Sequence, residues 1–130
     1  MDFPVIAAAT ASILALLQTF LGFLVGFARL KHNIGIGDGG NENLARKIRV
    51  HGNLTENAPL FLILLTILEL SGINNIVVIA YGAVFILARI SHAYALSHTV
   101  KPVPLRFLGA FGTNLAIVTE AGLILHQIFA

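Results

Sequence analysis

Residues 5–28 constrain the fold more than any other part of the chain. They read VIAAATASILALLQTFLGFLVGFA and hold 24 residues without a charge. About 20 such residues cross the hydrocarbon core of a bilayer as an α-helix. A cleaved signal peptide is the alternative, but Asp2 stands where a basic region should precede it, and the run is too long. We therefore expect a membrane-spanning helix here.

Three shorter uncharged runs follow, at residues 58–68, 76–88 and 107–119. Because each of these runs is shorter than a full crossing, each of the three helices must carry a polar end into or near the bilayer. Asn75 is the expected N-cap of the third helix and Ser71-Gly72 the expected stop of the second. With 57% hydrophobic and 11% charged residues, the chain is too apolar for an ordinary soluble domain. We predict an all-α integral membrane protein, one domain over residues 1–130, with spans at about 4–30, 43–71, 75–97 and 104–129.

The basic residues predict the topology. All eight lie around the first and third loops: Arg29, Lys31, Arg46, Lys47 and Arg49, then Arg89, Lys101 and Arg106. The positive-inside rule places both loops in the cytoplasm, and both termini and the turn at residues 71–75 on the opposite side. Because these residues flank apolar helices, we expect no nucleic-acid partner. For Lys31 and Lys47 we favour a topological role and contact with lipid phosphates.

The second helix carries a polar stripe. At 100° per residue, Arg46, Arg49, Asn53 and Glu56 fall within an arc of about 80°, Asn57 adjoins it, and His51 points away. The stripe descends roughly 15 Å, about half the depth of the hydrocarbon core. A carboxylate there costs several kcal/mol unless a cation or donor meets it. An Arg–Glu pair that only joins helices is the structural alternative, and we favour a binding site.

The third and fourth helices repeat this arrangement. Tyr81, Phe85, Arg89 and His92 share a face of the third helix. The fourth opens with Arg106 and continues with small residues that allow close helix packing: Gly109, Gly112, Thr113 and Ala116. Three helices thus present cations at one depth, which predicts a pocket for a polyanionic small molecule near the cytoplasmic interface, beside an apolar route from the bilayer.

Other signals carry less weight. GIGDGG at residues 35–40 follows no strand, so we interpret it as a loop. Asn53-Leu54-Thr55 is a glycosylation sequon on the cytoplasmic side and should be unmodified. The five histidines show no ligand pair at metal-binding spacing, and His126 with Glu120 is interpreted as an interhelical hydrogen-bonding element. Without cysteine, any thiol must come from a bound molecule.

The register R-x-x-R-x-x-x-N-x-x-E-x-x-P-L, formed by Arg46, Arg49, Asn53, Glu56 and Pro59-Leu60, resembles the second-helix signature of the MAPEG family. These are the membrane-associated proteins of eicosanoid and glutathione metabolism. GDGGNENLARKIRVHGNLTENAPLFLILLTILEL and ARISHAYALS resemble the small bacterial members. The resemblance covers the whole chain. It implies a homotrimer of four-helix bundles, with bent glutathione between neighbouring subunits.

The resemblance also implies residue roles. Arg49, Asn53 and Glu56 would hold glutathione, with the Glu56 carboxylate on its amino group, Asn57 adjoining and Arg46 in support. Arg29 matches an arginine near the thiol, and His92, beside Arg89, matches a residue facing glutathione. Arg106 matches the catalytic arginine, and Lys101 stands where some members have another arginine. The sequence departs at Asn57 and Leu96, where the family has tyrosines, and Tyr94 is displaced by two positions.

The predicted function is glutathione transfer, with possible peroxidase activity. A guanidinium beside the glutathione sulfur favours the thiolate, which is the nucleophile. Arg106 is the first candidate for this role and Arg29 the second. The substrate would be a lipophilic electrophile or lipid hydroperoxide, and the location the bacterial inner membrane. A non-catalytic lipid-binding protein of the same fold is the alternative. A proton-driven exporter ranks last, because residues 5–28 contain no acidic residue.

Overall fold

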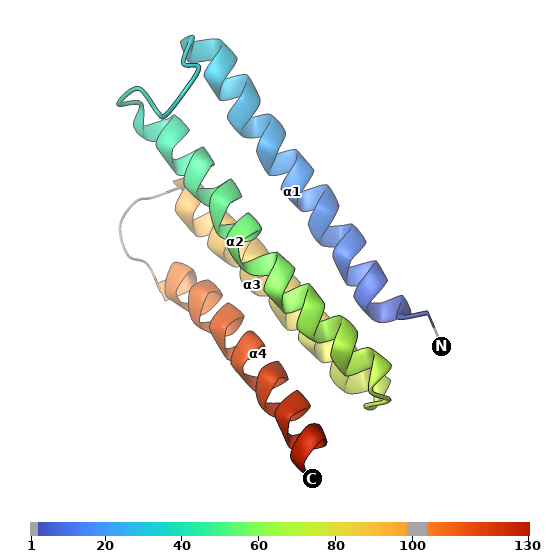
Figure 1. The fold of residues 1–130 in the computed structure, drawn as a ribbon. Helices are drawn as coiled ribbons and strands as arrows, with labels where there is room; N and C mark the ends of the chain where they lie inside the picture. Colours follow the sequence, from blue (N-terminus) through green and yellow to red (C-terminus); the bar gives the residue numbers. More distant parts are fainter. Residues whose placement is uncertain (1–2, 99–103) are drawn as a thin grey trace.

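The computed structural model describes residues 3–98 and 104–130, and this part of the chain forms four α-helices (Figure 1). They are α1 (Val5–His32), α2 (Glu42–Leu70), α3 (Asn75–His98) and α4 (Pro104–Phe129). All four are long and apolar enough to cross a membrane. The prediction of a four-helix membrane protein is therefore confirmed, and each helix begins and ends within two residues of its predicted span.

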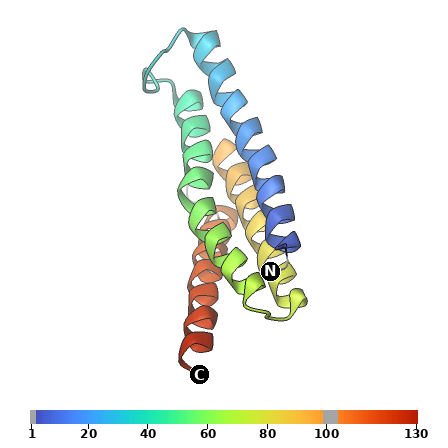
Figure 2. The ribbon, with the colours of Figure 1, turned by 45° about the vertical axis from the view of Figure 1, so that its right-hand side comes forward.

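Successive helices run in opposite directions, with α2 and α3 at the centre of the bundle (Figures 1 and 2). α1 packs on α2 and α3 at one side, and α4 packs on the same two helices at the other. The rings of Phe61 and Phe85 stack in the middle with their centroids 3.7 Å apart, and both side chains are fully buried. This contact fixes α2 against α3 immediately beside the polar residues of both helices.

The turn between α2 and α3 confirms one predicted helix end and corrects another. α2 ends at Leu70, and Gly72 follows in the left-handed conformation with φ of 79°, as expected for a stop at Ser71-Gly72. The predicted N-cap of α3, Asn75, is wrong by one position. Asn74 is the capping residue, because its side-chain oxygen accepts a hydrogen bond of 2.8 Å from the amide of Ile76. Asn75 is the first residue of the helix itself.

The start of α1 is capped by another helix. Pro4 precedes α1 and offers no side-chain hydrogen bond. The Glu69 carboxylate, in the last turn of α2, accepts hydrogen bonds from the amides of Ile6 (2.9 Å) and Ala7 (2.7 Å). A carboxylate is favoured at a helix N-terminus by both hydrogen bonding and the helix dipole. The α1–α2 pair is therefore fastened at the end opposite the first loop.

Candidate functional site

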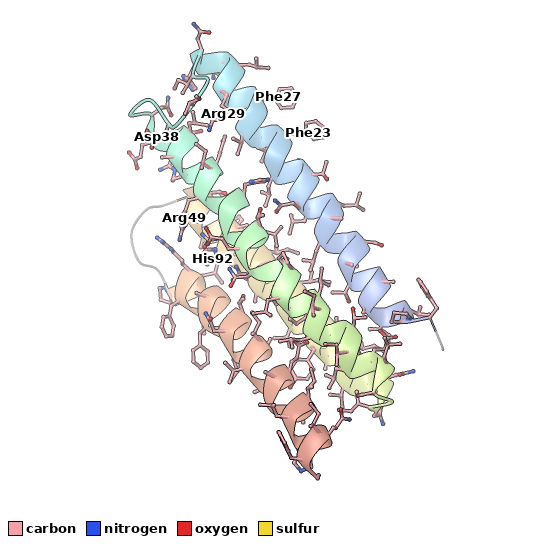
Figure 3. All side chains as sticks on the ribbon, viewed as in Figure 1. Phe23, Phe27, Arg29, Asp38, Arg49 and His92 are labelled. Carbon is pink, nitrogen blue, oxygen red and sulfur yellow. The ribbon has the colours of Figure 1, made fainter. Side chains whose placement is uncertain are left out.

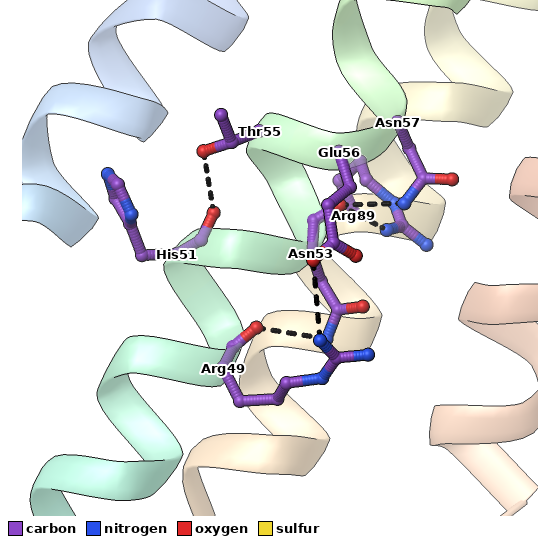
Figure 4. A network of polar contacts seen from close by, with 7 residues as sticks. All are labelled: Arg49, His51, Asn53, Thr55, Glu56, Asn57 and Arg89. Atoms are coloured by element: carbon purple, nitrogen blue, oxygen red, sulfur yellow. Dashed lines mark hydrogen bonds and ion pairs between the residues drawn. The ribbon is translucent and has the colours of Figure 1, made fainter. Parts of the chain in front are cut away.

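The polar stripe of α2, apart from Arg46, forms one connected set of polar groups (Figure 4). Arg49 Nη1 lies 3.3 Å from Glu56 Oε1, and the two side chains are 59% and 58% exposed. The amide groups of Asn53 and Asn57 donate to the backbone carbonyls four residues earlier, at 2.9 and 2.8 Å. The Arg49–Glu56 ion pair thus lies within one helix and does not itself join two helices in the described residues.

Arg89 of α3 is the buried cation of the site. Its side chain reaches both neighbouring helices, because Nη2 donates to the Gly109 carbonyl of α4 at 2.9 Å and Nη1 donates to the Asn53 carbonyl of α2 at 3.5 Å. Only 5% of the residue is exposed, and Nε is buried without a hydrogen-bond partner. These hydrogen-bond acceptors are carbonyls, so no carboxylate neutralises this guanidinium in the described part of the chain.

His92 lies one turn beyond Arg89 and is also buried, at 7% exposure. His92 Cβ lies against α4, because a Cβ added at Gly109 would be 2.8 Å from it. The α3–α4 contact is therefore at His92, one turn from the buried guanidinium of Arg89. Figure 3 shows Arg49 and His92 close to the first turns of α4.

A glycine makes this contact between α3 and α4 possible. A Cβ atom added at Gly109 would lie 2.8 Å from the Ala88 carbonyl oxygen and 2.8 Å from His92 Cβ. Real Cβ atoms do not approach other atoms so closely, so only glycine fits at this position. The buried face of α4 continues through the other small residues, Thr113 and Ala116.

Three predicted site residues lie elsewhere or outside the described residues. Arg29 Nη1 donates to carbonyls of the first loop, most closely to Gly37 at 2.8 Å, and Figure 3 shows it beside that loop and apart from His92. Arg46 pairs with Glu42 at 3.2 Å and lines a separate small cavity with Lys47 and Ser97. Lys101 lies outside the described residues.

Sequence reasoning missed a polar contact between α1 and α2. Gln18 Nε2 donates to the ring nitrogen Nε2 of His51 at 2.8 Å and to the hydroxyl of Thr55, which in turn donates to the His51 carbonyl. His51 therefore points away from the stripe, as predicted, because it faces α1. The available signal was Gln18 itself, an amide within an otherwise apolar run.

The predicted hydrogen bonding of Glu120 to another helix is not found among the described residues. Glu120 is fully buried, and neither carboxylate oxygen has a hydrogen-bond partner among the described residues, whereas His126 is exposed. The two residues are six apart on one helix, which is about 600° of rotation. Their side chains therefore point in directions about 120° apart.

Comparison with known proteins identifies the architecture. The model of the MAPEG family matches residues 7–126. The chain belongs to the MAPEG family. The inner membrane protein YecN of Escherichia coli strain K12 is 32% identical over 93 residues, which make up 72% of this chain and 71% of YecN. YecN of Escherichia coli O6:H1 strain CFT073 gives the same values.

Membership of the MAPEG family fits the distribution of polar groups in the bundle. The second-helix residues that carry the resemblance are Arg46, Arg49, Asn53 and Glu56, and all four lie within the matched range. Arg49, Asn53 and Glu56 form the connected set on α2, and Asn53 is the residue through which Arg89 joins it. The residues that carry the resemblance thus lie next to the buried guanidinium of Arg89.

Proposed function

We propose that this MAPEG protein is a glutathione transferase of the membrane, which binds glutathione beside Arg49, Glu56 and Arg89 and activates its thiol. The observation that carries this proposal is the uncompensated buried charge of Arg89. A buried guanidinium without an acidic partner is costly, and such residues inside membrane proteins usually belong to sites. An anionic ligand would supply the missing charge.

The side chains fit the groups of glutathione, which has two carboxylates, one ammonium and one thiol. Arg49 and Glu56 already form an ion pair that is more than half exposed, so both can exchange partners at little cost. Arg49 would then bind a glutathione carboxylate, and Glu56 the ammonium. Arg89 would stabilise the bound anion from the buried side of the site without changing its own position, because two carbonyls hold its guanidinium in place.

Arg106 is the residue we assign to thiol activation. It lies in the first turn of α4, the helix whose Gly109 packs against His92 and accepts a hydrogen bond from Arg89. A guanidinium near the sulfur favours the thiolate, and the proton leaves to water. The thiolate then forms a carbon–sulfur bond with a lipophilic electrophile as the leaving group departs. With a lipid hydroperoxide, the sulfur would attack oxygen and the O–O bond would break, and a second glutathione would complete the reduction.

A homotrimer is part of this proposal. The Arg49–Glu56 pair is open on one side in the single chain, and a neighbouring subunit would cover it. Large apolar side chains are exposed along α1 and α4, which suits both lipid and subunit contacts. Arg29 would then serve a neighbouring subunit's site, because in its own chain it lies beside the first loop and apart from His92. Kinship with an Escherichia coli inner membrane protein supports a bacterial inner membrane location.

The proposal is tested by the ultraviolet absorbance of the glutathione thiolate, recorded with purified protein in detergent. Wild type should bind glutathione and produce thiolate. Arg106→Ala should bind glutathione with little thiolate, and Arg49→Ala should lose at least tenfold in affinity. The exposed Arg49–Glu56 pair contributes at most about 1 kcal/mol to stability, so Arg49→Ala should remain folded. If wild type neither binds glutathione nor yields thiolate, the transferase proposal is refuted.

One observation favours a second function, lipid binding without catalysis. An apolar groove of about 420 Å³ lies between α3 and α4, lined by residues that include Tyr81, Val84 and Leu115. Its volume suits part of an acyl chain, and Asn57 and Leu96 replace tyrosines expected in catalytic members. Retention of a fatty acid by a protein that forms no thiolate would support this alternative.

A further inference from the structure

A second polar cavity lies on the opposite side of α2 from the glutathione site. It measures about 550 Å³ and opens between α1 and α2 near the first loop. Lys31 and His32 from the end of α1 and Asn43 and Lys47 from the first turns of α2 line its polar part. Lys47 and Arg49 are two residues apart, which is about 200° of rotation around the helix, so their side chains point to nearly opposite faces. The two sites therefore occupy different faces of one helix.

The polar part of this cavity is cationic and lacks a counter-charge. No Asp or Glu lines it, and neither Lys31 nor Lys47 has an ion-pair partner in residues 3–98 and 104–130. The nearby acidic side chains have other partners. Asp38 accepts a hydrogen bond from the amide of Gly40 at 2.9 Å, and Glu42 pairs with Arg46. The cavity is thus suited to an anion.

The other part of the cavity is apolar and continuous with the outer face of α1. Leu24 and Phe27 line it, and Phe27 is 65% exposed. Figure 3 shows Phe23 and Phe27 pointing away from the bundle, with ring centroids 6.3 Å apart. Lys31 lies about one turn beyond Phe27 on α1, so the change from apolar to cationic lining occurs where the membrane interface is expected.

We infer that this cavity binds an anionic phospholipid. Lys31 and Lys47 contact the phosphate, and an acyl chain lies along Leu24 and Phe27. A soluble phosphate would use only the cationic half of the cavity and leave its apolar half without a function. Glutathione suits the cavity poorly, because no carboxylate is present to receive its ammonium group. The inference does not depend on the proposed transferase activity.

The test is native mass spectrometry of the purified protein in detergent with equal amounts of dioleoyl phosphatidylglycerol and dioleoyl phosphatidylcholine. Wild type should retain phosphatidylglycerol at least tenfold more strongly. Each lysine near an anionic lipid contributes a factor of roughly five. The double variant Lys31→Gln/Lys47→Gln should therefore lose roughly twenty-five-fold in phosphatidylglycerol binding and keep its phosphatidylcholine binding. The charge-preserving variant Lys31→Arg/Lys47→Arg is the matched control and should bind like wild type.

Two further measurements separate the possible ligands. Phe27→Ala should weaken binding of the lipid severalfold, and glycerol 3-phosphate at the same concentration should not displace it. Glutathione affinity should be unchanged in Lys31→Gln/Lys47→Gln, which distinguishes failure of this inference from failure of the proposed function. Equal retention of both lipids, or an unchanged preference in the Gln variant, overturns the inference. Displacement by glycerol 3-phosphate overturns it in favour of a soluble-phosphate site.

Discussion

Two arginines of the site have the same chemistry and opposite environments, so one substitution should affect them differently. Arg89 is 5% exposed and lacks an acidic partner, whereas Arg49 is exposed and paired with Glu56. The carbonyls that accept from Arg89 also accept side-chain hydrogen bonds from Asn57 and Thr113, so they stay satisfied without it. We expect Arg89→Met to leave the unfolding free energy without glutathione unchanged or to raise it by up to about 2 kcal/mol.

The matched variant is Arg49→Met, for which we expect a change within about 1 kcal/mol. Both variants should lose at least tenfold in glutathione affinity, because each removes a charge from the same anion site. Unfolding in mixed micelles of detergent and dodecyl sulfate measures the first quantity, and isothermal titration the second. A loss of more than about 2 kcal/mol in Arg89→Met, with affinity retained, would show that Arg89 serves the fold and not the ligand.

The sequence predicted which residues share a helix face, but not which groups the ends of long side chains contact. Helical periodicity placed Arg49, Asn53 and Glu56 together because only the rotation per residue was needed. Arg29 and Arg46 have flexible side chains that bind local partners. Arg29 binds a loop carbonyl and Arg46 binds Glu42, and helical periodicity does not predict such contacts. Glu69 was missed because its partners are the amides of α1, more than 60 residues away along the chain.

At the scale of the helices, the contact between α3 and α4 depends on one glycine. An added Cβ at Gly109 would lie 2.8 Å from the Ala88 carbonyl oxygen, whereas one at Gly112 would lie 3.5 Å from Ala88 Cβ. We expect Gly109→Ala to destabilise the bundle by about 1–3 kcal/mol, since overpacking forces the helices apart. Gly112→Ala is the matched control and should change stability by less than about 1 kcal/mol. Equal melting temperatures for the two variants would contradict this account of the contact.

The cap that α2 provides to α1 gives a second prediction at this scale. Glu69→Gln removes the charge and one of two acceptor oxygens, so we expect a loss of about 1 kcal/mol in unfolding free energy. The amides of Ile6 and Ala7 should then exchange with deuterium faster, while those in the middle of α1 should not. Thr66→Val, one turn earlier on α2, is a suitable control because Thr66 bonds only within its own helix. Unchanged exchange at the start of α1 would disprove the cap.

Helix positions were predictable because long uncharged runs leave few alternatives. The first span is long enough without a polar end, the other three reach the length of a crossing only when their polar ends are included, and the helices begin and end accordingly. The precise start of α3 was not predictable, because two adjacent asparagines, Asn74 and Asn75, are equally good caps by type. Only the backbone geometry of the turn selects Asn74.

At the scale of the whole molecule, the order of the helices follows from short connections between antiparallel neighbours. Which faces meet lipid and which meet protein was less predictable, because all four helices are apolar around most of their circumference. Glu120 illustrates the difficulty. Its position gave no sign that both oxygens would be buried without a hydrogen-bond partner among the described residues, since the packing of α4 on α2 and α3 decides that.

The orientation of the bundle in the membrane is the prediction that belongs to the molecule as a whole. All eight Lys and Arg residues lie around the first and third loops, so those loops should be cytoplasmic. Because the chain has no cysteine, single cysteines report accessibility without any background. Ser71→Cys, in the exposed turn after α2, should react with a membrane-impermeant maleimide added outside intact bacterial cells whose outer membrane has been permeabilised. Ile36→Cys, in the exposed first loop, should react only after the inner membrane is broken. The reverse pattern would place the proposed glutathione site on the side of the membrane that cytoplasmic glutathione cannot reach. It would therefore count against the transferase proposal as well as the topology.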